Sequence, residues 1–499
     1  MTASPTQLAD ADRAALLAEL RRLERAARPL DPGAGRRRTL RTVAVAWSER
    51  FLRRLPTLRA FQESDDKGAG LLDAPIGEDG IPLADAMALL EREVLGPGAN
   101  PASGGHLAYI PGGGLYHAAI GDFIAAVSDK YAGVFFAGPG AVRMENMLVR
   151  WIADLVGYPP GAAGAIASGG SIATLAAICA ARDARGIAGA EVARAVVYLT
   201  THAHHCLQKS LRIAGLGRVT LRYVAMDDGH RMLPDALAQA IGADRQAGLE
   251  PWLVVASAGT VDAGAVDPIQ AIGEVARRER CWYHVDAAYG GFFLLTEHGR
   301  RALAGIERSD SVVLDPHKGL FMPYGAGVVI CRDAATLVAA HEYSGAYMQD
   351  AVRDPTELSP ADLSPELTKH FRGLRMWLPL ILAGVRPFRA ALEEKLLLAR
   401  YFHSEVRALG FEVGPPPDLS IVTYRWAPPD LTLERANAIN QRIVETVRRD
   451  GRIFLSSTML DGRFTLRMVA LAFRTHRRTM DLALRILREH AALAEAAVT

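Results

Sequence analysis

The chain has 499 residues, of which 50% are hydrophobic and 22% are charged, the composition of an ordinary soluble globular protein with more than one domain. Its 57 lysines and arginines stand against 55 aspartates and glutamates, so the formal net charge is only +2. This balance argues against a nucleic-acid or membrane-surface partner.

The cysteines and the apolar stretches indicate the cellular compartment in which the protein is expected. Cys179, Cys206, Cys281 and Cys331 have no paired spacing, which fits a reducing compartment better than a disulfide framework. The N-terminal residues show no basic segment followed by an apolar run, so no secretory signal is predicted. The longest uncharged stretch, 155–181, is interrupted by proline, glycine and serine, which argues against a transmembrane helix. We therefore expect a cytoplasmic protein.

The N-terminal part is predicted to be helical. Leucines recur at helical spacing over 16–23, and residues 51–55 continue the pattern. A helical arm of this size buries too little apolar surface to be stable alone, so we expect it to pack on the main body or on a second subunit. Residues 1–100 are assigned to this arm and dimerisation segment. A segment rich in glycine and proline, 96–114, interrupts the regular pattern.

The central part, assigned to 101–385, has the pattern of an α/β domain. From about residue 139 to 332, helix-like segments separate four short apolar runs: Ala195–Leu199, Trp252–Ala256, Trp282–Val285 and Ser311–Leu314. Near-continuous apolar strands divided by helices predict a mostly parallel sheet covered on both faces. In such a sheet, ligands bind beyond the carboxyl ends of the strands.

The C-terminal part, assigned to 386–499, is predicted to be a small α+β domain. A long helical region ends at about Leu409. A strand–helix–strand–strand–helix pattern follows, over Ser420–Arg425, Leu433–Arg448, Arg452–Ser457, Arg463–Ala470 and Arg477–His490.

Lys318 and Asp286 follow two of the central strands. A lysine attacks a carbonyl only where it can lose its proton, and taken alone Lys318 is better interpreted as a surface lysine. Asp286 changes this interpretation, because a carboxylate at the end of the apolar strand 282–285 needs a cation. The protonated pyridine nitrogen of pyridoxal phosphate is such a cation. The alternative for Asp286 is a helix N-cap.

Two further segments have the residue types of a cofactor site. The run 168–171, Ser-Gly-Gly-Ser, opens a predicted helix, where backbone N–H groups and the helix dipole favour a phosphate, although the same residues also cap ordinary helices. The run 202–206 contains three histidines and a cysteine. No second ligand cluster has matching spacing, so we predict no metal and prefer a histidine stacked on a flat ring over a structural histidine.

Together these residues resemble one family, the group II pyridoxal-phosphate decarboxylases, which include aromatic-amino-acid, histidine and glutamate decarboxylases. The resemblance covers about residues 104–487. It rests on Ser-Gly-Gly-Ser-x-Ala (168–173), His204 with Lys209 and Gly215, Ala-Gly-Thr (258–260) with Gly264 and Asp267, His-Val-Asp-Ala-Ala-Tyr-Gly-Gly (284–291), Pro-His-Lys (316–318), Phe-Arg-Gly-Leu-Arg-Met-Trp (371–377) and Leu-Arg-Met (466–468). Each motif is modest alone, but their order and spacing are specific.

The resemblance implies an aspartate-aminotransferase-like fold (fold type I) and a homodimer with the active site at its interface. It implies that Lys318 binds pyridoxal 5'-phosphate as a Schiff base and that Asp286 pairs with the ring nitrogen. His204 then stacks on one face of the ring, and Ala288 packs on the other. The remaining cofactor contacts that it implies are the phosphate ligands Gly170, Ser171 and His317, with Thr260 beside the cofactor.

The reaction that the resemblance implies is decarboxylation of an L-amino acid to the amine and carbon dioxide, a step of amino-acid and carboxylic-acid metabolism. In this family a tyrosine on a loop is associated with protonation of Cα, and aldehyde-forming relatives have phenylalanine there. Tyr347 falls at the matching position and favours amine formation; its alternative is an anchoring aromatic. An oxidative aldehyde synthase or another carbon–carbon lyase stays open. A non-enzymatic binding relative is disfavoured by the presence of Lys318 and Asp286.

The sequence also departs from the family pattern. Asp315 stands where many relatives have asparagine, and an acid near a phosphate is unfavourable unless it is paired or faces away. Val261 replaces a threonine and Gly319 a tryptophan, so we do not expect an ordinary animal-type aromatic decarboxylase. The substrate side chain is predicted to meet Tyr109 and Ile110, a mildly apolar wall that suits an aromatic or long side chain.

Overall fold

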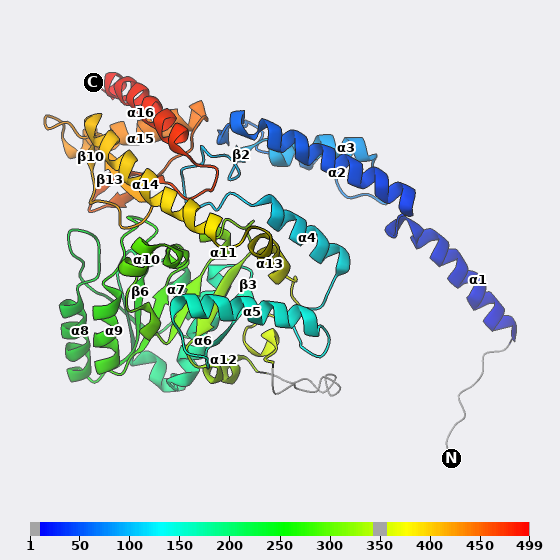
Figure 1. Cartoon of the computed structure of the whole chain (residues 1–499), viewed down its shortest axis with the longest axis horizontal. Coiled ribbons are helices and arrows are strands. Elements are labelled where there is room, and N and C mark those ends of the chain that lie inside the picture. The colour runs from blue at the N-terminus through cyan, green and yellow to red at the C-terminus, as the bar shows by residue number, and fades with distance from the viewer. Residues whose placement is uncertain (1–9, 343–356, 499) are drawn as a thin grey trace, which may run out of the picture. The chain divides into compact units, whose positions relative to one another are not determined.

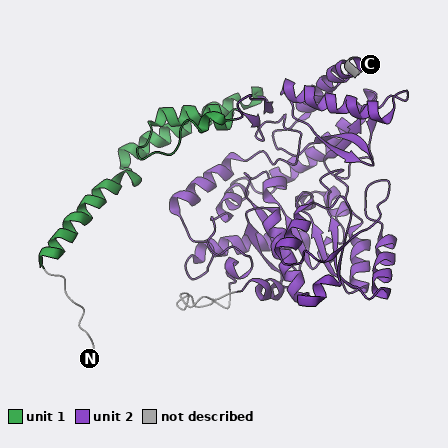
Figure 2. Ribbon diagram, turned by 180° about the vertical axis from the view of Figure 1, so that it is seen from behind, with its two compact units in different colours: residues 1–58, 68–96 green, residues 59–67, 97–499 purple. Residues whose placement is uncertain are grey.

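The computed structural model describes residues 10–342 and 357–498. The chain forms two compact units, one of residues 1–58 with 68–96 and the other of residues 59–67 with 97–499 (Figure 2). The first unit is helical, as predicted. Its helices are α1 (Asp10–Ala27), α2 (Ala34–Arg54) and α3 (Leu83–Leu89), which continues as a π-helical turn over Leu90–Leu95. Over 10–54, neither α1 nor α2 has a buried residue, and the leucines of α1 (Leu16, Leu17, Leu20 and Leu23) are 43–48% exposed in the single chain.

The second unit is built on a seven-stranded sheet of order β3-β9-β8-β7-β6-β4-β5. The strands are β3 (Ala163–Ala167), β4 (Ala195–Leu199), β5 (Thr220–Tyr223), β6 (Glu250–Ser257), β7 (Trp282–Asp286), β8 (Ser311–Leu314) and β9 (Gly327–Cys331). Five strands from β5 to β8 run parallel, whereas β9 is antiparallel to both of its neighbours. The four apolar runs identified in the sequence are all strands, and the mostly parallel sheet is confirmed.

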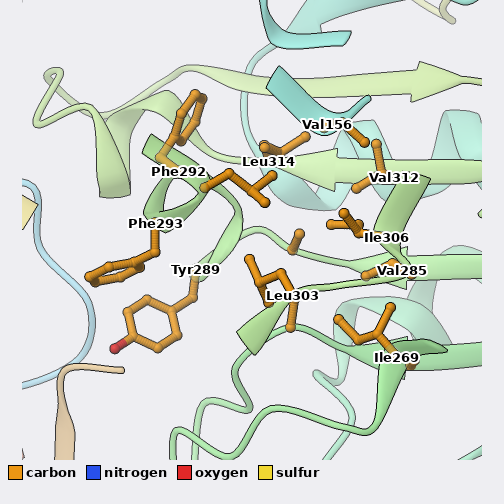
Figure 3. Packing of buried hydrophobic residues seen from close by; sticks show 14 of the residues in the cluster. Val156, Ile269, Val285, Tyr289, Phe292, Phe293, Leu303, Ile306, Val312 and Leu314 are labelled. Carbon is orange, nitrogen blue, oxygen red and sulfur yellow. The ribbon is translucent and has the colours of Figure 1, made fainter. Parts of the chain in front are cut away.

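Helices cover both faces of this sheet, because alternate strand residues point to opposite sides. The main helices of the unit are α4 (Tyr116–Ser128), α5 (Pro139–Val156), α6 (Gly170–Ala184), α7 (Cys206–Ile213), α8 (Pro234–Gln246), α9 (Ile269–Arg278), α10 (Glu297–Ala302), α11 (Pro316–Gly319), α12 (Ala334–His341) and α13 (Gly373–Ala383). On one face Val156 of α5 and Ile269 of α9 join Val285 and Val312 in a single core (Figure 3). On the other face α6 and α7 cover Val255 and Val313.

A smaller antiparallel sheet of order β10-β11-β13-β12 lies in the C-terminal part (Figure 1). Its strands are β10 (Glu412–Val413), β11 (Ile421–Arg425), β12 (Ser456–Leu460) and β13 (Arg463–Val469). The long helices of this part are α14 (Arg386–Ala408), α15 (Leu433–Asp450) and α16 (Arg477–Val498). The predicted order of elements is confirmed. Both sheets belong to one compact unit, and the domain boundary expected near residue 385 stays a prediction.

One strand begins later than expected. The sequence predicts a strand over Arg452–Ser457, but β12 starts at Ser456. The preceding segment pairs elsewhere: Phe454 N donates to Gly105 O at 2.9 Å, and Leu107 N donates to Phe454 O at 2.8 Å. Strands β1 (Phe61–Gln62) and β2 (Gly98–Ala99) form a separate two-stranded ladder. The residue before β1 is hydrogen-bonded to the segment that precedes β12, because Ala60 N donates to Gly451 O at 2.8 Å.

The polar residues of β6 and β7 lie at the ends of neighbouring strands that pair in register. Ser257 at the end of β6 pairs with Asp286 at the end of β7, and Asp286 pairs with Val313 of β8. The carboxyl ends of these three strands therefore meet at one edge of the sheet, where parallel sheets bind ligands. Over 10–342 and 357–498, no helix has the length and apolar character that a bilayer crossing requires.

Candidate active site

A cavity of about 310 Å³ lies beyond the carboxyl ends of β6, β7 and β8. Four segments far apart in the sequence line it: the 168–174 turn, the histidine run that starts at 202, the 257–261 turn, and residues that follow β7 and β8. Of the predicted cofactor residues, the cavity is lined by Gly170, Ser171, His204, Thr260, Asp286, Ala288, His317 and Lys318.

Lys318 lies in α11, the single helical turn that follows β8. Its Nζ is 2.8 Å from Asp315 Oδ2, and the Lys318 side chain is largely buried. Burial lowers the pKa of Lys318, but Asp315 and then Asp286 raise it by more, so the pKa is raised above its ordinary value. In the free protein, Lys318 is an ammonium held by Asp315. The surface-lysine interpretation is wrong for this residue.

Asp286 is the last residue of β7, and its Oδ1 accepts a hydrogen bond from Ala288 N at 3.1 Å. Asp286 lines the same cavity as Lys318, and its negative charge contributes to the raised pKa of Lys318. Ala288 lines the cavity beside it. A carboxylate at the floor of this cavity matches the need of a protonated ring nitrogen for a counter-charge.

His204 lies between β4 and α7. Its Nδ1 accepts a hydrogen bond from Cys206 N at 3.2 Å, so a neutral ring keeps its proton on Nε2. Burial lowers the pKa of His204, which favours this neutral form. A neutral imidazole on the cavity wall is suited to stacking on a flat ring. Over the residues that the structure describes, no three side chains of histidine, cysteine, aspartate or glutamate gather as a metal-binding cluster.

The turn before α6 lines the cavity with backbone of small residues. Gly169 is the N-cap of α6 in extended backbone, and Ile172 N and Ala173 N donate to its carbonyl at 3.1 Å. A Cβ on Gly170 would lie 2.8 Å from Asp315 Oδ2, so only glycine fits here without displacement. His317 Nδ1 is hydrogen-bonded to Ala326 O, and its Nε2 lies 3.7 Å from Asp315 Oδ2.

The opposite wall is a turn closed by Thr260. Ala265 N donates to Thr260 Oγ1 at 3.2 Å, and Thr260 N donates to Ala265 O at 2.8 Å. Asp267, buried beneath the turn, accepts from Met232 N at 2.7 Å and from Ser257 N at 2.8 Å. Burial raises the pKa of Asp267 to about 6. These bonds fix the backbone that carries Thr260.

Two arginines of the quoted motifs support the site without entering the cavity lining, and sequence reasoning did not give them roles. Arg467 of β13 donates to the carbonyl of Asp262 at 2.8 Å, to Ser456 Oγ at 2.8 Å and to the carbonyl of Val261. Arg375 of α13 donates to Asp122 at 2.7 Å and to Tyr324 O at 2.8 Å, which ties α4 to the loop after Lys318. The only signal in the sequence was their place inside motifs.

Two predicted substrate residues, Tyr109 and Ile110, do not line this cavity. Tyr109 has a positive φ of 55° and is 61% exposed, whereas Ile110 is buried in the main core. Tyr347 lies outside the described residues. Their roles in substrate binding and in protonation of Cα stay predictions.

The residues present fit pyridoxal phosphate. The cavity offers a lysine amine, a carboxylate opposite it, a neutral imidazole wall and a helix N-terminus next to two glycines. The buried Asp315 Oδ1 has no hydrogen-bond partner among the described residues. Buried polar atoms without a partner are rare, and one in a cavity is expected where a ligand binds.

Comparison with known proteins agrees with this chemistry. The family model described as the pyridoxal-dependent decarboxylase conserved domain matches residues 92–426. The chain belongs to this family. The decarboxylase therefore uses pyridoxal 5'-phosphate, has the fold-type-I architecture, and is a carboxy-lyase that acts on an L-amino acid.

Individual relatives are similar over most of their length. The decarboxylase is 32% identical to the aromatic-L-amino-acid decarboxylase of Bacillus atrophaeus, over 85% of this chain and 88% of that protein. It is 27% identical to phenylacetaldehyde synthase of Arabidopsis thaliana, over 77% and 81%. The crystal structure of Oryza sativa TDC with PLP and tryptamine superimposes with a TM-score of 0.86 at 26% identity, over 93% of this chain and 99% of that one.

Proposed function

We propose that the decarboxylase converts an aromatic L-amino acid to the corresponding amine and carbon dioxide, as a homodimer in the cytoplasm. The observation that carries the chemistry is the convergence of Lys318 and Asp286 on one cavity. The similarity to the aromatic-L-amino-acid decarboxylase of Bacillus atrophaeus over 85% of the chain supports the substrate class.

The bound cofactor supplies a ring that accepts the electron pair released when the carboxylate leaves as carbon dioxide. In this proposal Asp286 keeps the ring nitrogen protonated, and His204 and Ala288 hold the ring from its two faces. Gly170 and Ser171 at the helix N-terminus, together with His317, would bind the phosphate. Lys318 would supply the amine that anchors the cofactor.

Amine rather than aldehyde is the proposed product. The support is Tyr347, since the family associates a tyrosine at this loop position with protonation of Cα and phenylalanine with aldehyde formation. The similarity to phenylacetaldehyde synthase keeps the aldehyde as the alternative product. Tyr109 and Ile110 are proposed as the wall that meets the substrate side chain.

The proposed homodimer is supported by an apolar stripe on α4. Tyr116, Ile120, Phe123 and Val127 recur at helical spacing on one face, and Val127 is 72% exposed. Exposed apolar stripes of this kind mark protein–protein contacts. The proposed occupant is a second copy of the chain. Phe123→Glu should shift the mass measured by light scattering from dimer to monomer; an unchanged dimer would count against this face.

The cytoplasmic location is supported by the cysteines. Cys179, Cys206, Cys281 and Cys331 are all free, and three of them are buried. Free thiols persist in a reducing compartment. Fractionation of the cells that make the protein, followed by immunodetection, tests this location.

The substrate is tested by a panel of L-amino acids. Carbon dioxide, amine, aldehyde and peroxide are measured for each, with Lys318→Ala as the control without a covalent cofactor link. We expect amine and carbon dioxide in equal amounts from an aromatic amino acid. Aldehyde with peroxide as the main products would reject the proposed reaction, and turnover of only acidic or small amino acids would reject the substrate class.

The product is tested separately with Tyr347→Phe. We expect this variant to retain the cofactor, seen by its absorbance, and to lose amine formation. Unchanged amine turnover in Tyr347→Phe would mean that another group protonates Cα.

A further inference from the structure

A second cavity, of about 650 Å³, lies between the smaller sheet and the turn that follows β5. It is lined by β10, by the ends of β11 and β13, by the turn between β12 and β13, and by residues 226–230. The cavity shares no lining residue with the cofactor cavity. Its volume is in the range of cavities that bind small molecules.

The smaller sheet turns a polar face toward this cavity. Thr423 of β11 pairs in register with Arg467 of β13, and residues two apart on a strand point to the same side. Thr423, Arg425 and Thr465 therefore lie on one face of the sheet, and all three line the cavity. Val422, on the opposite face, belongs to the apolar core beneath the helices.

Arg425 is a buried cation whose guanidinium is largely unpaired. Its side chain is only 5% exposed, and its Nε has no hydrogen-bond partner among the described residues. Nη2 donates to Asn437 Oδ1 at 3.4 Å. Glu412 Oε2 lies 3.9 Å from Arg425 Nε, but the other oxygen of Glu412 is paired with Arg463 at 3.0 Å.

The burial of Arg425 is unfavourable for the fold unless something binds its charge. Burial lowers the pKa of Arg425, yet a guanidinium stays protonated in proteins. A buried charge without close partners destabilises the folded state. Residues that lower stability in this way are typical of binding sites, because the missing partner is supplied by the ligand. The planar fork of an arginine matches a carboxylate.

The other lining residues restrict the kind of carboxylate. Asp228 and Asp461 are exposed acidic side chains of the same lining. A simple anion would be repelled by them, whereas a molecule that also carries an ammonium group would be attracted. Met226, Val413 and Leu460 add apolar surface to the cavity. Carboxylate, ammonium and an apolar group together are the features of an apolar amino acid.

We propose that this cavity binds a free amino acid with an apolar side chain, at a site separate from the cofactor. Arg425 binds the α-carboxylate through two parallel N–H groups, and Asp228 and Asp461 bind the α-ammonium. The apolar lining residues receive the side chain. This inference rests on the chemistry of the second cavity and not on the substrate proposed for the cofactor site.

The two cavities are neighbours. His202 lines the cofactor cavity and His230 lines the second one, and their ring centroids are 5.1 Å apart. Arg467, on the same sheet face as Arg425, donates to the carbonyl of Asp262 at 2.8 Å, in the turn after Thr260. The second site therefore holds an amino acid beside the cofactor cavity while that cavity is itself occupied.

The test is calorimetric titration of the holoenzyme after borohydride reduction. Reduction fixes the cofactor on Lys318, so an added amino acid cannot replace that link. We expect L-phenylalanine to bind once per chain. 3-Phenylpropionate lacks the ammonium and phenethylamine lacks the carboxylate, and each should bind at least about tenfold more weakly. No binding of L-phenylalanine, or equal binding of either analogue, would overturn the proposal.

Arg425→Met assigns the binding to this cavity. The substitution removes the charge and leaves no carboxylate alone, because Glu412 keeps its pair with Arg463. L-Phenylalanine should bind at least about tenfold more weakly, while the midpoint of urea unfolding should not fall, since an unpaired buried charge has been removed. Unchanged affinity, or a lower unfolding midpoint, would show that Arg425 has a structural role instead.

The acidic side is tested with Asp228→Asn combined with Asp461→Asn. Both positions are exposed, so the fold should be retained, and L-phenylalanine should bind about tenfold more weakly. Asp430→Asn, at an exposed position outside the cavity lining, is the matched control and should bind as the native protein does. Equal binding by the double variant and the control would contradict an ammonium-bearing ligand. None of these titrations measures turnover, so a wrong substrate class would leave them unchanged.

Discussion

Lys369 and Glu145 form an ion pair with 2.6 Å between Nζ and Oε2, and both side chains are almost completely buried. Lys369 Nζ also donates to Ile166 O at 3.1 Å, and Glu145 Oε1 accepts from Gly373 N at 3.1 Å. The pair joins α5, β3 and the start of α13. Because Ile166 lies two residues before Ser168, the pair also supports the strand that leads into the phosphate turn.

We expect Lys369→Met to lower the free energy of unfolding by about 3 to 5 kcal/mol, because it leaves Glu145 buried without its cation. Urea unfolding of the native protein and the variant measures the difference. Lys369→Met combined with Glu145→Leu removes both charges and should recover much of the loss. Glu297→Ala breaks an exposed pair with Arg301 and should cost at most about 1 kcal/mol. Equal losses from the buried and the exposed pair would contradict this view.

Gly170→Ala should weaken cofactor binding about tenfold, since the added methyl group meets the Asp315 carboxylate at the edge of the phosphate turn. Titration of the cofactor-free protein with pyridoxal phosphate, followed by absorbance, measures the dissociation constant. Gly140→Ala is the matched control, because no atom lies within 4 Å of a Cβ at that position of α5. If both variants bound the cofactor equally, steric space at Gly170 would not be the cause.

Arg467→Ala should destabilise the protein by about 2 to 3 kcal/mol and weaken cofactor binding, because it releases the carbonyl groups of the turn that follows Thr260. Arg467→Lys should not restore either property, since one ammonium cannot reproduce the fork of the guanidinium. Arg463→Ala, from an exposed position of the same strand, is the control for loss of charge. Full rescue by lysine would indicate that charge alone matters.

The stability of the protein should fall in acid below about pH 6.5. Burial lowers the pKa of His284 to about 4 and that of His106 to about 4. Between pH 6.5 and 4 the unfolded chain therefore binds protons at these sites that the folded chain does not. Their stabilisation is complete above pH 6.5 and is lost as the pH falls. Protonation of the unfolded chain at each of these two histidines should lower the free energy of unfolding by about 2 kcal/mol at pH 5, relative to its value above pH 6.5.

Urea unfolding at pH 7.5 and pH 5 measures this loss. His284→Asn should reduce the difference between the two pH values, whereas His476→Gln, which changes an exposed side chain, should leave it unchanged. A pH difference as large in His284→Asn as in the native protein would exclude His284 as a source.

The sequence by itself determined the elements and the chemistry of the cofactor site. The apolar runs that became β4, β6, β7 and β8 are local patterns, and burial on both faces requires them. Lys318 and Asp286 could be paired in advance because parallel strands place their carboxyl ends at one edge of a sheet. The histidine run and the 168–171 turn were linked to the same cofactor by their residue types and by the resemblance to the decarboxylase family, and all of these segments line one cavity.

Only the tertiary structure decided which side chains contact one another across that edge. The ion pair of Lys318 with Asp315 depends on the geometry of a single helical turn, and the close approach of Asp315 to Gly170 depends on how that turn packs against the start of α6. Arg467 reaches the turn that follows Thr260 from the smaller sheet, although it lies 205 residues after Asp262 in the chain. Such contacts join segments that are far apart in the sequence. A local residue pattern does not specify the spatial distance between such segments, so these contacts are determined only by how the folded chain packs.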